Sequence, residues 1–277
     1  MDLAPLFRDD RRIEIVDVGA ADLDGGQIPP YNALIDAGVC RVTGFEPNPD
    51  EFTKLAQSAA RRYLPNAIGD GRDTTLNITK APGFSSVLAP NIDASAMISR
   101  FSRQMRVVQR VPVKTSRLDD MEEIEIIDFL KIDIQGGERM VFEGGRTKLS
   151  KAVVIQTEVA FFPLYHDQPN FGDQDRMLQS LGFQFFGMQT VNKFQMPGIS
   201  DAHRKASRRA DIGPWVDGDA VYVRKMKTWT ALPSEDIRRM IVLLSRICSA
   251  WNAVAYLANI LKGRGEFLPD QLQELLN

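Results

Sequence analysis

The sequence predicts a doubly wound α/β fold, and three observations support this prediction. Short apolar runs rich in β-branched residues recur along the chain, which is the pattern of strands buried on both faces of a parallel sheet. Segments of helical length separate most of these runs, as in βαβ units. The first two runs, residues 13–21 and 41–47, follow one another in this way. We therefore expect about seven strands in one sheet, with helices between most of them.

The first two strands predict a binding site at the edge of this sheet. The run 13–21 breaks at Asp17 and then at Gly19, and the run 41–47 ends in Glu46 and a proline. A glycine at the carboxyl end of a strand lets a ligand approach the backbone. An acid at the end of the second strand stands where an open α/β sheet presents a carboxylate to a ribose diol. The pair therefore predicts a nucleoside-binding half-site.

Helices are predicted on either side of the second strand. The segment 28–39 has apolar residues at loosely helical spacing, and Gly38 marks its end. Asn48 or Asp50 is a suitable cap for a helix that runs from Phe52 to Arg62. The next predicted elements are a strand at 63–70, a strand at 74–79, a polar turn at 83–88, a helix at 93–104 and a strand at 107–113.

The second strong core signal is the apolar run 124–134. It ends in Lys131-Ile-Asp133, passes through Gln135 and turns on two glycines into a helix that begins near Glu138. The strand after it has another acid, Glu158, at its carboxyl end. The remaining predicted elements are a strand at 152–159, a helix at 173–181, a strand at 183–187 and a strand at 219–224 that pairs antiparallel at the sheet.

Two segments lie outside this repeating pattern. Two interpretations of the connection 193–215 remain open. It caps the site and recruits an acceptor that is acidic or carries phosphate, or it is a solvated basic loop. Its basic and imidazole residues are His203, Arg204, Lys205, Arg208 and Arg209. From Ser234 the chain is predicted to be helical, and 240–261 is apolar apart from a few polar residues that argue against a membrane span. We divide the chain into a domain at 1–230 and a helical extension at 231–277, whose residues 234–262 pack on their own domain or on a second copy.

Composition excludes several classes of protein. The 277-residue chain has a net charge of −2, which gives no general attraction to nucleic acid. Its two cysteines, Cys40 and Cys248, argue against a disulfide framework and against a cysteine metal site. The first residues lack a basic start followed by an apolar core, so no secretory signal is predicted and the expected location is cytoplasmic.

The glycine pattern weighs against one class of nucleotide-binding enzyme. The Gly-x-Gly-x-x-Gly fingerprint that cradles a pyrophosphate is absent after Gly19, because the next glycines are Gly25 and Gly26. This disfavours a nicotinamide-dependent dehydrogenase, although Glu46 suits the ribose of that cofactor equally well. Asp70, after the third strand, either accepts a hydrogen bond from an adenine amino group or is a simple turn aspartate.

Several motifs together resemble one enzyme family. They are Asp17-Val-Gly-Ala20, Phe45-Glu46-Pro47-Asn48-Pro49, Asn66-Ala67-Ile68-Gly69-Asp70, Ser85-Ser86-Val87-Leu88, Leu118-Asp119-Asp120 and Lys131-Ile-Asp133-Ile-Gln135-Gly-Gly-Glu138. In order and spacing they resemble the FkbM family of S-adenosylmethionine-dependent methyltransferases, over roughly residues 13–190. Ala21 departs from that pattern by replacing a common asparagine, and Gln135 departs from it by replacing a usual glutamate.

The resemblance implies a class I methyltransferase, with a Rossmann-like seven-stranded sheet, helices on both faces and S-adenosylmethionine as cofactor. It implies that Asp17 and Gly19 lie near the methionine part of the cofactor and that Glu46 binds its ribose. The predicted cofactor-binding residues are Asp17, Gly19, Ala20, Glu46, Pro47 and Asp70.

Three residues are candidates for the chemical step. Asp133 is expected beside the reacting centre, and Glu158 or His166 is expected to remove the proton of an acceptor hydroxyl. Asp133 and Glu158, with Asp119, could instead hold one divalent cation, but no ligand spacing in the sequence demands a metal.

The function predicted on these grounds is O-methylation of a carbohydrate or secondary-metabolite hydroxyl, so the partner is a small-molecule or glycan acceptor. A catalytically silent methyltransferase-like module for binding or assembly is the alternative, because Ala21 and Gln135 depart from the family pattern. The dehydrogenase remains the less favoured enzyme class.

Overall fold

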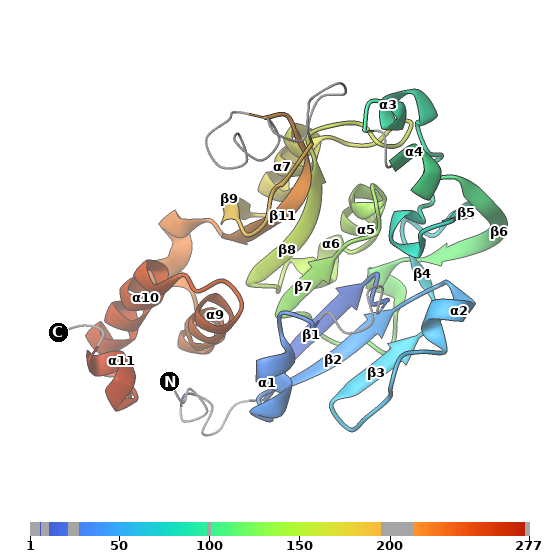
Figure 1. Ribbon diagram of the computed structural model, residues 1–277. Helices are drawn as coiled ribbons and strands as arrows, with labels where there is room; N and C mark the ends of the chain where they lie inside the picture. The colour runs from blue at the N-terminus through green and yellow to red at the C-terminus, as the bar shows by residue number, and fades with distance from the viewer. Residues whose placement is uncertain (1–5, 7–10, 22–27, 99–100, 195–212, 275–277) are drawn as a thin grey trace.

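The computed structural model describes residues 6, 11–21, 28–98, 101–194 and 213–274. Among these residues the main sheet has eight strands in the order β10-β11-β8-β7-β1-β2-β3, with β9 paired to β11 (Figure 1). Its strands are β1 (Ile13–Val18), β2 (Cys40–Phe45), β3 (Arg61–Leu64), β7 (Phe129–Ile132), β8 (Val154–Ala160), β9 (Phe183–Met188), β10 (Asn192–Lys193) and β11 (Trp215–Arg224). The predicted α/β class is confirmed.

Strand pairing brings three predicted motifs to one edge of the sheet. β1 runs parallel to β2, where Val18 pairs with Phe45, and parallel to β7, where Val18 pairs with Ile132. The residues that follow these three strands therefore lie together. β8 continues the parallel sheet beside β7, and β11 runs antiparallel to β8, as the sequence predicted for 219–224.

A second, three-stranded sheet stands beside this edge. It consists of β4 (Ala67–Ile68), β5 (Asp73–Thr79) and β6 (Val107–Ser116), in the order β4-β6-β5. The predicted single strand 63–70 is therefore wrong, because its first part joins the main sheet as β3 and its later part joins the small sheet as β4. Pro65 lies between the two parts and has no N–H to donate to a ladder, which favours the break.

Several helices are shorter than predicted. The described helices are α1 (Asn32–Asp36), α2 (Pro49–Phe52), α3 (Ile92–Ala96), α4 (Phe101–Gln104), α5 (Glu138–Gly144), α6 (Arg146–Leu149), α7 (Phe171–Ser180), α9 (Ser234–Arg246), α10 (Trp251–Gly263) and α11 (Asp270–Glu274). Asn48 caps α2 as predicted, since its side chain accepts from the backbone N–H of Asp50 at 3.1 Å. The predicted helix to Arg62 is wrong, because β3 begins at Arg61 and pairs with β2.

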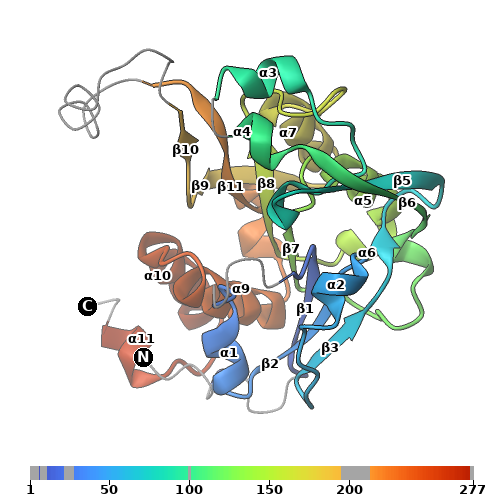
Figure 2. The same ribbon diagram turned by 45° about the vertical axis from the view of Figure 1, so that its right-hand side comes forward.

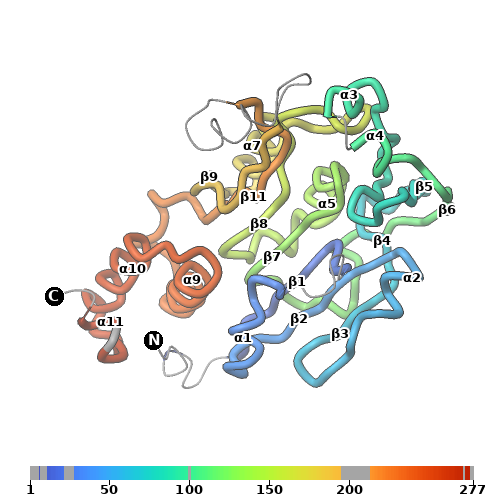
Figure 3. The backbone as a smooth tube through the Cα atoms, in the orientation of Figure 1, coloured from blue at the N-terminus to red at the C-terminus, as the bar shows by residue number. Residues whose placement is uncertain are grey.

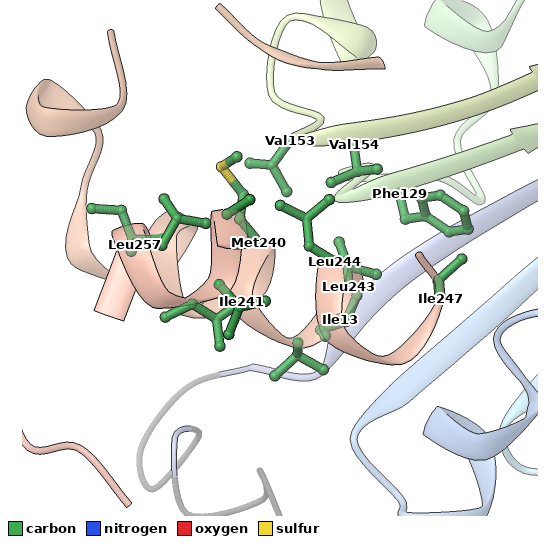
Figure 4. Packing of buried hydrophobic residues seen from close by; sticks show 14 of the residues in the cluster. Ile13, Phe129, Val153, Val154, Met240, Ile241, Leu243, Leu244, Ile247 and Leu257 are labelled. Atoms are coloured by element: carbon green, nitrogen blue, oxygen red, sulfur yellow. The ribbon is translucent and has the colours of Figure 1, made fainter. Parts of the chain in front are cut away.

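The two faces of the main sheet are covered by different parts of the chain. α5 and α7 pack on one face, whereas α1, α9 and α10 pack on the other (Figure 2). In Figure 4, Leu244 and Ile247 lie toward Val154 and Phe129 of the sheet, and Met240 lies beside Val153. The helices α1 and α2 have only five and four residues, too few to cover this face. The carboxyl-terminal helices therefore supply its cover, so they pack on their own domain, the first of the two alternatives that the sequence left open.

A buried ion network also links α9 to the sheet. Asp128 is 1% exposed and accepts from both guanidinium nitrogens of Arg11, at 2.6 and 2.7 Å. The Nε atom of Arg239 on α9 lies 3.7 Å from the same carboxylate.

No helix within the described residues is long and apolar enough to span a membrane. The basic residues 203–209 of the predicted loop lie outside the described residues.

Candidate active site

A pocket with about 730 Å³ of empty space, partly open to solvent, lies at the carboxyl ends of β1, β2 and β7. Figure 3 shows the connections that leave these strands on the side where the small sheet stands. The pocket wall includes Gly19, the segment 45–48, Glu51, the segment 66–68 and the segment 133–135.

Gly19 joins two of these connections. Its φ is +84°, and a Cβ atom at this position would stand 2.0 Å from the carbonyl oxygen of Asp133. Asp133 donates its backbone N–H to the carbonyl of Val18 at 3.1 Å. Only a glycine allows this approach, so Gly19 fixes the position of Asp133 relative to β1. The N–H of Ala20 donates to the carbonyl of Phe45 at 3.0 Å, and Ala20 does not line the pocket.

Glu46 presents a buried carboxylate to the pocket. Its side chain is 7% exposed, and its Oε1 atom accepts from the backbone N–H of Asn48 at 2.7 Å. Burial and the nearby carboxylate of Glu51 together raise the pKa of Glu46 to about 7, against the lowering effect of the N–H groups of Asn48 and Ala21. Pro47, the next residue, also lines the pocket.

Two other predicted cofactor residues do not face the pocket. Asp17 is 2% exposed, and its carboxylate accepts from the hydroxyl of Tyr31 at 2.5 Å and from Nζ of Lys131 at 3.1 Å. Asp70 accepts from the backbone N–H of Arg72 at 3.0 Å and forms an ion pair with the Arg72 side chain at 3.5 Å. Neither side chain lines the pocket, so both carboxylates are held by protein partners instead.

The opposite end of the site contains two carboxylates bridged by an amide. The Nε2 atom of Gln135 donates to Asp133 Oδ1 at 2.9 Å and lies 3.1 and 3.0 Å from the two carboxylate oxygens of Glu158. The hydroxyl of Tyr165 lies 3.0 Å from Gln135 Oε1, and Ser86 donates to the Gln135 carbonyl at 2.7 Å. Gln135 adopts a φ of +58° in this arrangement, in the left-handed region.

Burial and like charges change the protonation of this end. Burial raises the pKa of Glu158 well above its ordinary value, and the carboxylates of Asp133 and Asp217 raise it further. Burial also raises the pKa of Glu138 to about 7, although its Oε1 atom accepts from the backbone N–H groups of Ile134 and Gly136. Glu158 therefore retains its proton to higher pH than an exposed glutamate.

A methyltransferase FkbM domain model matches residues 17–185, more than half of the chain. The chain belongs to the FkbM methyltransferase family. This match confirms the predicted family, and S-adenosylmethionine is the methyl donor of that family. No curated protein matches the chain significantly.

Solved structures similar to this FkbM family member include three methyltransferases. The FkbM methyltransferase from Methylobacillus flagellatus has a TM-score of 0.39 and 14% identity, and the match covers 76% of this chain and 43% of that chain. An S-adenosylmethionine-dependent methyltransferase from Mesorhizobium loti has a TM-score of 0.37, 10% identity and coverages of 80% and 95%. A magnesium protoporphyrin IX methyltransferase from Synechocystis has a TM-score of 0.34, 11% identity and coverages of 80% and 76%.

The residues of the pocket fit the cofactor of the FkbM family. Glu46 offers a buried carboxylate that can accept hydrogen bonds from ribose hydroxyls. Pro47 and Ile68 give the same pocket an apolar lining suited to a flat base. Asp133 and Gln135 line the β7 side of the same pocket.

The structure separates two predicted residues from this centre. His166 is exposed and does not line the pocket, and its backbone N–H donates to the carbonyl of Ala89. The carboxylate of Asp119 accepts from the backbone N–H groups of Thr147 and Lys148 at the start of α6, so it does not join Asp133 and Glu158. Within the described ranges, no group of three His, Cys, Asp or Glu side chains is placed to hold a metal ion.

Sequence reasoning missed two features of the site. The sequence patterns do not single out Glu51, which lines the pocket five residues after Glu46. Gln135 was noted only as a departure from the family, whereas the structure makes it the bridge between Asp133 and Glu158. The available sequence signal for Glu51 is its closeness to Glu46 at the end of the second predicted strand.

Proposed function

We propose that this protein is an S-adenosylmethionine-dependent O-methyltransferase that acts on a hydroxyl of a carbohydrate or secondary metabolite. The observation that carries the proposal is the single pocket with different chemistry at its two ends. Glu46 lines one end, and Asp133 and Gln135 line the other, where the Gln135 amide also reaches the carboxylate of Glu158.

The Glu46 end is suited to hold the nucleoside. A buried carboxylate with backbone donors from Asn48 and Ala21 keeps further acceptor capacity for ribose hydroxyls. S-adenosylmethionine, when bound, supplies an electrophilic methyl group. Pro47, Gly19 and Glu46 would fix its orientation, which is the main requirement of a direct displacement.

The Asp133 end is suited to take a proton. In methylation of an alcohol, the acceptor oxygen forms the new bond to the methyl carbon as the carbon–sulfur bond breaks, and the hydroxyl proton goes to a base. A carboxylate with a raised pKa is a stronger base than an exposed one, and Glu158 meets this condition beside Asp133. Gln135 holds the two carboxylates side by side with its amide N–H groups.

The proposal is tested in two steps. Isothermal titration calorimetry with S-adenosylhomocysteine and with NAD checks the cofactor, and we expect binding of the first alone. Transfer of labelled methyl groups to a panel of sugars and hydroxylated metabolites then checks the reaction. Tight binding without transfer to any hydroxyl in the panel would contradict the O-methyltransferase and favour the catalytically silent module.

A further inference from the structure

One carboxylate oxygen in the pocket wall has no protein partner. Glu51 on α2 is 4% exposed and lines the pocket. Its Oε1 atom accepts from Nζ of Lys54 at 2.7 Å. Its Oε2 atom is buried and has no hydrogen-bond partner among the described residues. An unpaired buried carboxylate oxygen is costly, so its presence in a ligand pocket indicates a donor on the ligand.

The other acidic groups of the pocket are already engaged. The lining residues include three acids, Glu46, Glu51 and Asp133. Asp133 accepts from Gln135 at the β7 end, and Glu46 is the carboxylate assigned above to the ribose. Asp70, which the sequence offered as a partner for an adenine amino group, binds Arg72 outside the pocket. An adenine amine therefore lacks its expected acceptor, and among the described lining residues Glu51 is the acid that has a buried oxygen without a hydrogen-bond partner.

We propose that Glu51 is a specificity-determining residue that accepts a hydrogen bond from the exocyclic amino group of the cofactor's adenine. This inference rests on the proposed S-adenosylmethionine site. Glu51 shares the pocket with Pro47 and Ile68, whose apolar surfaces suit a flat purine ring. An ionised carboxylate makes a stronger hydrogen bond to an N–H donor than a neutral acceptor does. It also repels a ring that presents a carbonyl at the same position.

The contact between Glu51 and Lys54 does not explain the free oxygen. Lys54 engages only Oε1, and its own side chain is 56% exposed, so the pair contributes little to stability. If Glu51 served only to form the ion pair with Lys54, its side chain could be exposed to solvent. Its burial in the pocket wall instead matches a residue that meets a ligand.

The test combines a variant with a ligand that lacks the amino group. Glu51→Met keeps the length of the side chain and removes both acceptor oxygens, whereas Glu51→Gln keeps one. Asp50→Asn is the matched control, because Asp50 lies on the same helix but is exposed and outside the pocket. Calorimetry measures binding of S-adenosylhomocysteine and of its purine analogue with hydrogen in place of the amino group.

We expect Glu51→Met to weaken S-adenosylhomocysteine binding about 10- to 100-fold, Glu51→Gln to weaken it less and Asp50→Asn to leave it unchanged. Wild-type protein should bind the amine-free analogue more weakly than S-adenosylhomocysteine, and Glu51→Met should not weaken it further. An equal loss for both ligands, or no loss for either, would overturn the role of Glu51. If Glu51→Met does not fold, equal wild-type affinity for the two ligands overturns it as well. Failure of wild-type protein to bind S-adenosylhomocysteine would instead refute the cofactor site itself.

Discussion

The two ends of the pocket handle negative charge in different ways. At the β2 end, Glu46 lines the cavity, and its carboxylate partners are the backbone N–H groups of Asn48 and Ala21. At the β7 end, Asp133 and Glu158 share the amide of Gln135, and further acids raise the pKa of Glu158. The Glu46 carboxylate keeps hydrogen-bond acceptor capacity for a ligand, whereas the carboxylates of Asp133 and Glu158 accept hydrogen bonds from a protein side chain. This contrast supports the proposal that the β2 end binds the cofactor and that the β7 end takes the proton of the acceptor.

The sharpest test of this difference is Asp133→Asn. Asparagine keeps an oxygen that can accept from Gln135, so the change removes the charge and preserves the contact. We expect turnover to fall about 10²- to 10⁴-fold, while affinity for S-adenosylhomocysteine changes by less than about fivefold. Methyl transfer to the acceptor identified in the panel and calorimetry give the two values. Asp120→Asn, at an exposed site, is the control. Equal losses in turnover and affinity would make Asp133 a scaffolding residue.

The complementary change at the other end is Glu46→Ala. It removes the proposed ribose acceptor, so we expect cofactor binding to weaken by about 2 kcal/mol, or roughly 30-fold. Turnover at saturating cofactor should change much less, because the Asp133 end remains intact. Calorimetry with S-adenosylhomocysteine measures the affinity, and Asp50→Ala provides an exposed control beside the pocket. Unchanged affinity would contradict the ribose assignment and remove the contrast between the two ends.

A third test asks whether the amide bridge is required. Gln135→Glu would place a third carboxylate within about 3 Å of Asp133 and Glu158, in place of the N–H donors. We expect the free energy of unfolding to fall by about 1–2 kcal/mol at pH 8, and less at pH 5.5, where the added group is protonated. Urea denaturation at the two pH values measures this.

The control for the bridge is Gln179→Glu on α7. Gln179 also donates to a carboxylate, that of Asp175 at 2.6 Å, but Gln179 is exposed and water screens the added charge. The free energy of unfolding of the Gln179→Glu variant should therefore differ from that of the wild-type protein by less than about 0.5 kcal/mol at either pH. If the two variants lose the same stability, the bridge at Gln135 has no special role.

The sequence predicted the edge of the sheet better than the contents of the site. Gly19, Glu46 and Asp133 follow apolar strands, and parallel pairing brings the ends of such strands together whatever the loops do. Asp17 and Asp70 have the same local signature, yet Lys131 and Arg72 engage them. Those partners come from tertiary contacts or turn geometry, which strand patterns do not encode.

Helix lengths were also overpredicted for a tertiary reason. The segment after Phe52 has helical spacing, but Arg61 to Leu64 gains a full ladder of hydrogen bonds beside β2. The face left uncovered by such short helices is filled by α9 and α10 from the end of the chain. The spacing of apolar residues within one segment could not show that helices from the end of the chain cover this face of the sheet.

The pH dependence of cofactor binding is the smallest effect that separates the two ends. Because the pKa of Glu46 is raised to about 7, only part of this carboxyl is ionised at neutral pH in the cofactor-free protein. We expect S-adenosylhomocysteine to bind about tenfold more tightly at pH 8 than at pH 6, since the ionised form is the better acceptor for ribose hydroxyls. Calorimetry at the two pH values measures the ratio.

Stability of the cofactor-free protein should follow the opposite trend. The folded pKa of Glu46, about 7, exceeds its ordinary value of 4.5, so the folded state binds more protons than the unfolded state between these values. The free energy of unfolding from this group therefore falls as pH rises through that window, while cofactor affinity rises. Glu46→Gln cannot titrate and should flatten the affinity profile, whereas Asp133→Asn should leave it sloping. A slope that survives Glu46→Gln would assign the titration to another group, and the β2 end would lose its distinct electrostatic role.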